Sequence, residues 1–326
     1  MPLKTKKSTT KKSTTNTLYV PRKIYFYVVR FKNNGNCIDP TKVFKYIDTL
    51  PFDDVGRYQK IDDTKGLSMH IESCISPLKF RLGTRRLGDL PFQENQGNIS
   101  GVTLPKDHVL FEPSHFMIDI DNAGFENNIM AFEFNFYGPR IGKFTPYMLE
   151  KTFPVVDQVE LLPLMNTDFE SKLRKIGEIR KFEIGIQRNN GELLKELDES
   201  FADATRVLGN LSDSEFIEII IRHKKRSKKP IKLSFIRNIE KLRKFFKQPG
   251  VIDNVDTFRV RAENRYSDEI ETFDFLEEYL VSKRSVIKID EKHRSVDTEA
   301  MYNSMGDAYR ELKNEINTII KKDKNV

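Results

Sequence analysis

Cysteine, tryptophan and long apolar runs are scarce or absent in this chain of 326 residues. The sequence contains two cysteines, Cys37 and Cys74, and no tryptophan. Because the cysteines are far apart and lack CxxC spacing, they argue against a disulfide-stapled secreted module and against a cysteine zinc site. No apolar run reaches the roughly eighteen residues that indicate a membrane-spanning helix. We therefore expect a soluble protein with free thiols in a reducing, cytoplasmic compartment.

Sequence motifs for catalysis are missing as well. The five histidines show no metal-ligand spacing, and no GxSxG nucleophile motif occurs. The segment GPRIGK (138–143) lacks the length and the hydroxyl residue of a phosphate-binding loop, so we expect it to end a strand. These absences predict a non-enzymatic protein that uses no cofactor and no metal.

The first seventeen residues, MPLKTKKSTTKKSTTNT, carry five lysines and no apolar core segment. This composition differs from that of a secretory signal and is typical of a disordered basic tail. Such a tail can also add a loose attraction to a polyanion. The chain as a whole contains 24 phenylalanines and 11 tyrosines, enough aromatic side chains for a sizeable folded core.

Strand patterns dominate residues 18–176. Lys23–Phe31 (KIYFYVVRF) is apolar on both faces, as in a buried central strand. The runs 116–121 and 132–136 alternate apolar and polar residues, which predicts an antiparallel pair with one solvated face. A helix is predicted after Asp39, with a proline in its first turn. We expect an N-terminal domain built on a mixed β-sheet.

Strand and helix patterns alternate after residue 176. The predicted order is strand, helix, strand, helix, strand, which is typical of a layered α/β unit. The predicted segments are a strand at 179–187, a helix at 193–208 that ends at Gly209, a strand at 216–221, a helix capped by Ser234 that stops before Pro249, and a strand around 258–262.

A long helix is predicted over Asp297–Lys322. Its apolar residues recur every three or four positions from Met301 to Ile319. Such a stripe either packs on the helix's own domain or, since it spans more than two heptads, forms the seam of a homodimer. The fold class is α+β, and the predicted divisions are a tail at 1–17, an N-terminal mixed β-sheet domain at 18–176, and a C-terminal layered α/β domain at 177–326 that includes the long helix.

Positive charge is concentrated in one internal segment. The formal net charge is +7, yet Arg222–Lys247 alone contains twelve Lys or Arg and one acidic residue, Glu240. When the five lysines of the tail are set aside too, the rest of the chain carries a net charge of −9. Self-repulsion within such a segment is relieved when an external anion neutralises it. The segment therefore indicates a surface that binds a polyanion.

We expect the loop at 223–229 (HKKRSKK) and the helix after Ser234 to form one basic ridge that follows DNA phosphates. Because no zinc-finger, basic-zipper or helix-turn-helix signature occurs, we expect double-stranded DNA to be bound with little sequence preference. Arg259, Arg261 and Arg265 extend the ridge if their face of the sheet adjoins it. The predicted DNA-binding residues are Lys224, Lys225, Arg226, Lys228, Lys229, Lys232, Arg237, Lys241, Arg243, Lys244 and Lys247.

Other interpretations of the basic segment stay open. It is also typical of a solvated charged face, or of internal ion pairs with the acidic remainder of the chain. RNA and an anionic membrane surface are competing polyanions. A helix that buries its apolar face has no wedge left to insert into lipid, which disfavours the membrane.

A metal-dependent nuclease is the alternative that has a catalytic site. Asp119 and Asp121 on one strand and Glu133 on the other are expected to face the same side of the predicted pair. Facing carboxylates can hold Mg²⁺ and activate water for phosphodiester cleavage. Alternating acids on a solvated sheet face are also an ordinary surface pattern.

From Gly138 to its end, the chain resembles RexA, the cytosolic component of phage-encoded superinfection-exclusion systems. The resemblance covers somewhat more than half of the sequence, and the order of its short motifs carries more weight than any single motif. Residues 32–115 match poorly, and the basic tail has no counterpart. The matching segments are GPRIGKFTPYMLEK (138–151), QVELLPLM (158–165), ADATRVLGN (202–210) with the strand and basic helix that follow, and MYNSMGDAYRELKNEI (301–316).

The resemblance implies a homodimeric DNA-binding protein of an anti-phage defence system, with little sequence preference. Carried over by position, Lys224–Lys247 would hold the DNA contacts. The resemblance also implies that the protein senses phage DNA or protein–DNA complexes and signals to a membrane-protein effector of the same system. That effector is an expectation from the kind of system, since no residue of this chain points to it.

Overall fold

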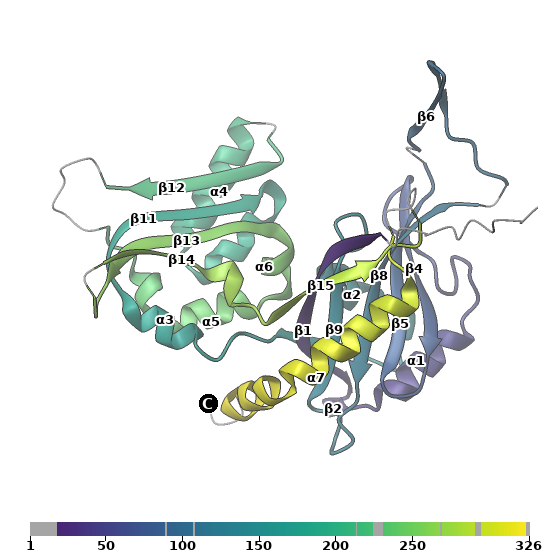
Figure 1. Ribbon diagram of the computed structural model, residues 1–326, viewed down its shortest axis with the longest axis horizontal. Helices are drawn as coiled ribbons and strands as arrows, with labels where there is room; N and C mark the ends of the chain where they lie inside the picture. Colours follow the sequence, from purple (N-terminus) through teal and green to yellow (C-terminus); the bar gives the residue numbers. More distant parts are fainter. Residues whose placement is uncertain are drawn as a thin grey trace, which may run out of the picture.

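The computed structural model describes residues 18–88, 90–106, 108–212, 214–223, 231–267, 269–290 and 295–323. Two large β-sheets with covering helices, and a separate two-stranded hairpin, make up this part of the chain (Figure 1). The α+β class is confirmed. Every strand pairing among the described residues is antiparallel, so the first sheet does not have the mixed strand directions that were predicted.

Strand β1 is an interior strand of the first sheet, buried along most of its length, as its apolar run predicted. It pairs along one edge with β9, and β15 and β10 share its other edge. The sheet has the order β10–β1–β9–β8–β5–β4–β3, with β2 also paired to β1. Its strands are β1 (Tyr19–Asn33), β2 (Asn36–Cys37), β3 (Gln59–Lys60), β4 (Lys65–Ser73), β5 (Leu78–Arg86), β8 (Leu110–Asp119), β9 (Asn128–Phe134), β10 (Gln158–Pro163) and β15 (Val281–Ile287); a separate hairpin joins β6 (Phe92–Asn95) and β7 (Asn98–Gly101).

One face of the first sheet packs against helices through a cluster of aromatic rings. The ring of Phe116 lies 5.0 Å from that of Phe80 and 5.5 Å from that of Phe144. The first helix begins where predicted, because Asp39 Oδ1 accepts a hydrogen bond from the backbone nitrogen of Thr41 (2.8 Å). The helices of this face are α1 (Pro40–Thr49), the 3₁₀ turn η1 (Ile141–Lys143) and α2 (Phe144–Thr152).

The opposite face is covered by the C-terminal helix α7 (Thr298–Asp323), which crosses the sheet (Figure 1). Met301, Met305 and Ala308 are fully buried against residues of β1, β8 and β9. The long helix is therefore confirmed. The prediction that one face of the β8–β9 pair is solvated is wrong. A helix from nearly 200 positions along the chain covers that face, and alternation within the two strands could not reveal it.

The end of the chain returns to the first sheet. β15 pairs with β1 from Tyr19 to Tyr25, and α7 packs on the same sheet. The prediction that residues 177–326 form one C-terminal domain is therefore wrong for the residues from Val281 onward, which belong to the first sheet and its covering helix. Since the apolar stripe of α7 is buried inside its own chain, this stripe does not form the predicted dimer seam. Homodimerisation stays a prediction that would need another surface.

The second sheet has the order β12–β11–β13–β14 and carries helices on one face. Phe182, Ile184 and Ile186 point into its core, as their alternation predicted. The strands are β11 (Ile176–Gln187), β12 (Phe216–Arg222), β13 (Val255–Asn264) and β14 (Ile270–Asp274); the helices and 3₁₀ turns are α3 (Phe169–Lys175), η2 (Arg188–Glu196), α4 (Glu199–Leu211), η3 (Ser234–Arg237), α5 (Ile239–Lys247), α6 (Pro249–Asn254) and η4 (Phe275–Glu278).

The predicted bounds of two helices in this unit are wrong. Helix α4 is capped by Asp198 and passes through Gly209, which had been expected to end it. Ser234 opens a 3₁₀ turn without a side-chain cap, and Asn238 caps α5 instead. At the start of each helix, the side chain of a residue later than the predicted start accepts a hydrogen bond from one backbone N–H group of the first helical turn.

A buried ionic network holds the start of α7 against β8 and β9. Glu133 accepts hydrogen bonds from Arg22 Nε (2.7 Å) and contacts His115 Nδ1 (2.6 Å). The other ring nitrogen of His115 lies 3.3 Å from Thr298 Oγ1, at the first residue of α7. Burial by itself would raise the pKa of Glu133, but the contacts with His115 and the charge of Arg22 outweigh it and hold that pKa below its ordinary value.

We predict that Glu133→Ala lowers the free energy of unfolding by about 3–5 kcal/mol, because it leaves buried His115 and partly buried Arg22 without their carboxylate. Urea denaturation at neutral pH measures this. Glu112→Ala, which breaks the more exposed pair with Arg86 (3.0 Å), is the control and should cost less than about 1 kcal/mol. Because the pKa of Glu133 is lowered, its contribution is present above the ordinary carboxyl pKa and is lost as pH falls through the lowered value. Equal, small losses for the two variants would contradict this account.

Candidate nucleic-acid interface

Helix α5 fixes the direction of the basic side chains around it. Leu242, Phe245 and Phe246 are fully buried in the core of the second sheet, and the ring of Phe246 lies 5.0 Å from that of Phe258. Residues three or four positions apart share one face of a helix. Glu240, Lys241 and Lys244 lie on the other side of α5 and are exposed, as the amphipathic pattern predicted.

Four of the predicted DNA-binding residues are exposed, and we call them the exposed basic group: Lys232, Arg237, Lys241 and Lys244. Among the residues that the structure describes, no carboxylate lies within the 4.0 Å of an ion pair from any of their charged nitrogens. The acidic remainder of the chain, as far as it is described, thus does not fold over them.

Two further predicted residues differ from this group. Arg243 is half-buried and forms an ion pair with Glu170 of α3, so its charge is already matched within the chain. Lys247 is half-buried and lines the cleft between the two sheets. Fewer of the described cations are exposed than the predicted basic ridge required.

The other five predicted residues, Lys224, Lys225, Arg226, Lys228 and Lys229, lie outside the described residues. The described residues on either side of them lie beside the first half of β11. The backbone nitrogen of His223 donates to the carbonyl of Arg180 (3.2 Å), and that of Ile231 donates to the carbonyl of Ile179 (3.4 Å). Lys232 of the exposed basic group follows directly.

The arginines of β13 do not extend the exposed basic group. Phe258 and Val260 point toward the helices, so Arg259 and Arg261 point to the opposite face of the sheet. Arg259 is also paired with Asp274 (2.7 Å). The expectation that these arginines continue the ridge is therefore wrong, because the sheet itself separates them from α5.

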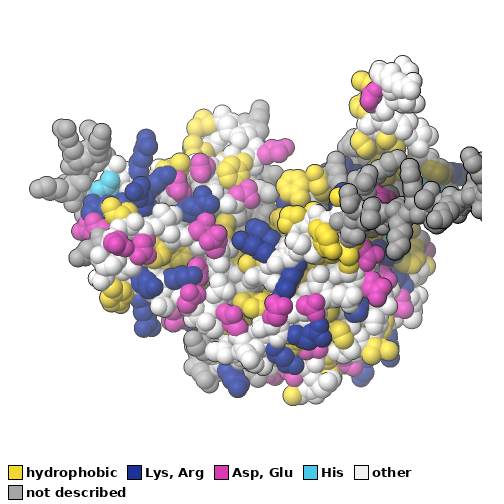
Figure 2. Space-filling model, viewed as in Figure 1, with side chains coloured by type: hydrophobic (Ala, Val, Ile, Leu, Met, Phe, Trp, Pro, Cys, Tyr) yellow, Lys and Arg dark blue, Asp and Glu magenta, His cyan; other side chains and the backbone are white. Residues whose placement is uncertain are grey.

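A row of cations that the sequence did not reveal crosses this opposite face. Strand register places Arg222, Lys181 and Arg261 side by side on β12, β11 and β13. Neighbouring strands are about 4.8 Å apart, so the three charges are close. Carboxylates are interspersed with them, and Lys181 pairs with Glu183. Figure 2 shows basic and acidic side chains mixed over this part of the surface.

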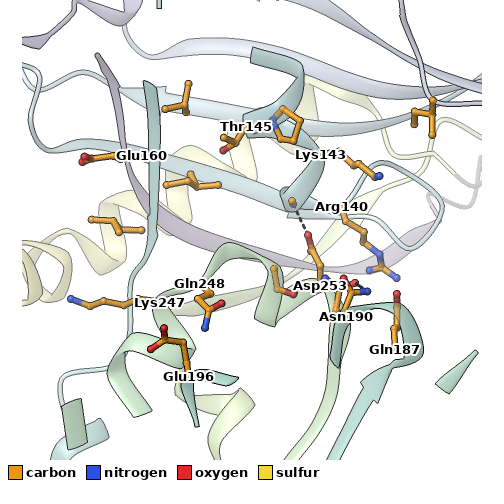
Figure 3. A pocket seen from close by; sticks show the side chains of 18 of the residues that line it. Arg140, Lys143, Thr145, Glu160, Gln187, Asn190, Glu196, Lys247, Gln248 and Asp253 are labelled. Carbon is orange, nitrogen blue, oxygen red and sulfur yellow. Dashed lines mark hydrogen bonds between the residues drawn. The ribbon is translucent and has the colours of Figure 1, made fainter. Parts of the chain in front are cut away.

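A cleft of about 1330 Å³ lies between α5 and the start of α2. Figure 3 shows Arg140 and Lys143 on the side of the first sheet and Lys247 on the side of the second. The guanidinium of Arg140 lies 4.3 Å from the ring centroid of Phe134, a cation–π contact that positions it. Lys244 belongs both to the cleft and to the exposed basic group, so the two basic surfaces are continuous.

Asp253 of α6 connects the two walls of this cleft. Its Oδ2 accepts a hydrogen bond from the backbone nitrogen of Gly142 in η1 (Figure 3). Its Oδ1 is buried and has no hydrogen-bond partner among the described residues. Burial raises the pKa of Asp253 to about 6, against the opposing effects of the Gly142 N–H and the charge of Arg140.

We predict that Asp253→Asn changes the pH dependence of stability. A carboxyl with a raised pKa stabilises the folded state most when protonated, so this contribution is lost as pH rises from about 4 to about 6. The asparagine stays neutral and its Oδ1 can still accept from Gly142, so at pH 7.5 the variant should be more stable than wild type by up to about 3 kcal/mol. Urea denaturation across this pH range measures it, with Asp256→Asn on the exposed face of β13 as control. Parallel stability profiles for wild type and Asp253→Asn would refute the assignment.

The three carboxylates of the alternative nuclease site do not come together. Glu133 lies four positions along β9 from the residue that pairs with Asp119, about 13 Å at the rise of a strand. Asp119 accepts a hydrogen bond from Tyr309 Oη (2.7 Å), and Asp121 binds backbone nitrogens of its own turn. No three His, Cys, Asp or Glu side chains form a metal site within the described ranges. The expected shared Mg²⁺ site is therefore wrong.

Comparisons of the chain with protein-family models, curated proteins and solved structures find no match. The resemblance to RexA therefore stays an expectation from the quoted motifs. Within the described residues, no helix combines the length and the apolar character that a membrane crossing requires.

Proposed function

We propose that the chain binds double-stranded DNA through its phosphates, with little sequence preference. The observation that carries the proposal is the outward direction of Lys232, Arg237, Lys241 and Lys244, without acidic partners, on a chain that is acidic outside its basic segments. Cations that no internal carboxylate matches gain most when they displace the counterions around a duplex. The lysines and arginines of 224–229 adjoin this group in sequence.

The exposed basic group is a better interface than the row of cations on the second sheet. On that sheet, carboxylates such as Glu183 and Asp274 neutralise their neighbours and would repel phosphates. Around α5, Glu240 is the one acidic residue in the segment from Arg222 to Lys247. Association with a polyanion favours the surface where one sign of charge prevails.

We further propose that the protein acts without catalysis, as a sensor in an anti-phage defence system that signals to a partner such as a membrane-protein effector. The support for this part is the resemblance of residues 138–326 to RexA, together with the DNA-binding surface argued above. A homodimeric state is proposed on the same resemblance.

We predict that Arg237→Glu with Lys241→Glu weakens binding to a duplex of random sequence at least about 10-fold, because two phosphate contacts are lost and two repulsions are introduced. Fluorescence anisotropy at low salt measures the affinity. The matched control is Lys181→Glu with Arg261→Glu, which changes the net charge by the same amount on the opposite face of the second sheet and should weaken binding less than about 3-fold.

Equal losses for the two double variants would show that only net charge matters, and would overturn the assignment of the interface to α5. Wild-type protein that fails to bind any duplex at low salt would overturn the proposed function itself. A duplex RNA of the same length, measured in parallel, tests the preference for DNA.

A further inference from the structure

The cleft between α5 and α2 adjoins the proposed DNA-binding surface at Lys244, and its own lining is also charged. Five cations line it from both sides: Lys60, which is paired with Asp63 (2.6 Å), and Arg140, Lys143, Lys244 and Lys247. The carboxylate of Glu160, also in its wall, is already paired with Arg30 (3.1 Å) and Lys32. The other two carboxylates of the lining are Glu196, which is exposed, and Asp253, which accepts a hydrogen bond from Gly142. Because five cations and three carboxylates line the cleft, positive charge prevails and the cleft favours an anion.

The cleft is large enough to admit a small organic anion. Its volume of about 1330 Å³ is much larger than a single anion needs, and somewhat above the range of about 300–1,000 Å³ that is usual for small-ligand pockets. None of its described lining residues is aromatic, so it lacks the stacking platforms that hold single-stranded nucleic acid. Val159, Leu161 and Leu162 give one wall an apolar character.

The wall on the side of the second sheet carries four amide side chains: Gln187, Asn190, Gln248 and Asn254. Asn190 Nδ2 donates to Asn254 Oδ1 (2.9 Å), and Asn254 Nδ2 donates to the carbonyl of Gly250 (2.7 Å), which fixes the orientation of two of them. An amide presents a donor and an acceptor together, the pattern that pairs with N6 and N7 of adenine. Figure 3 shows Gln187 and Asn190 close to Arg140.

We propose that this cleft binds an adenine nucleotide, with its phosphates against Arg140, Lys143 and Lys244 and its base against the amides of η2 and α6. Asp253 acts as a positioning residue, since its bond to Gly142 holds the turn from which Arg140 and Lys143 extend. The site goes beyond duplex binding and does not depend on it.

Isothermal titration of the full chain with ATP tests the site. The expected result is saturable binding of one ATP per chain, weakened at least about 10-fold in Arg140→Ala with Lys143→Ala, because charge-assisted hydrogen bonds to phosphate are lost. The matched control is Arg237→Ala with Lys241→Ala, which removes the same charge outside the cleft and should change ATP affinity less than about 2-fold. Arg140 contacts the ring of Phe134, so its replacement can impair folding. In that case Lys143→Ala alone, at an exposed position, replaces the double variant and should also weaken ATP binding.

Tripolyphosphate and UTP are titrated in the same way. ATP binding that is clearly tighter than both supports recognition of the base, whereas equal affinities overturn the adenine nucleotide and leave only attraction of anions. No heat of binding at about 1 mM ATP, or equal losses in the cleft and control variants, overturns the site. A chain that binds ATP and no duplex would reject the proposed function alone, and a chain that binds duplex and no ATP would reject this inference alone.

Discussion

The burial of the apolar side of α5 is the constraint on which the basic surface depends. Leu242, Phe245 and Phe246 are fully enclosed, and each contributes about 1.5–3 kcal/mol through the area that it removes from water. Rotation of the helix would expose all three, so the charged positions between them keep one direction. The same burial leaves no apolar wedge on α5 for a lipid surface. The charge of this segment is thus held outward by the core beneath it.

Local patterns in the sequence were sufficient for much of the fold. The apolar run of β1, the alternation in β11 and the stripe of α7 each predicted an element that the structure contains, because the periods of strand and helix act within a few residues. The direction of Lys241 and Lys244 followed from the same reasoning, since it depends on their spacing from the buried residues of α5.

Features that depend on distant contacts were beyond this reasoning. The pairing of β15 with β1 and the packing of α7 on the first sheet moved the end of the chain out of the predicted second domain. Strand register places Arg261 beside Lys181, and the second sheet with its apolar core separates Arg261 from α5. Local spacing in the sequence encodes neither fact. The contact of Asp253 with Gly142 joins residues 111 positions apart, and no local pattern in the sequence connects the two.

The basic surface and the cleft share Lys244, so one continuous band of positive charge runs from α5 to the start of α2. The central claim is that the described cations of this band, together with the adjoining basic segment, neutralise phosphates. The most direct test is the salt dependence of duplex binding by the wild-type chain, measured from about 50 to about 200 mM salt. Neutralisation of at least four phosphates predicts a linear plot of log K against log salt with a slope of about −3.6 or steeper. A slope near zero would contradict the account, because binding would then not rest on phosphate neutralisation.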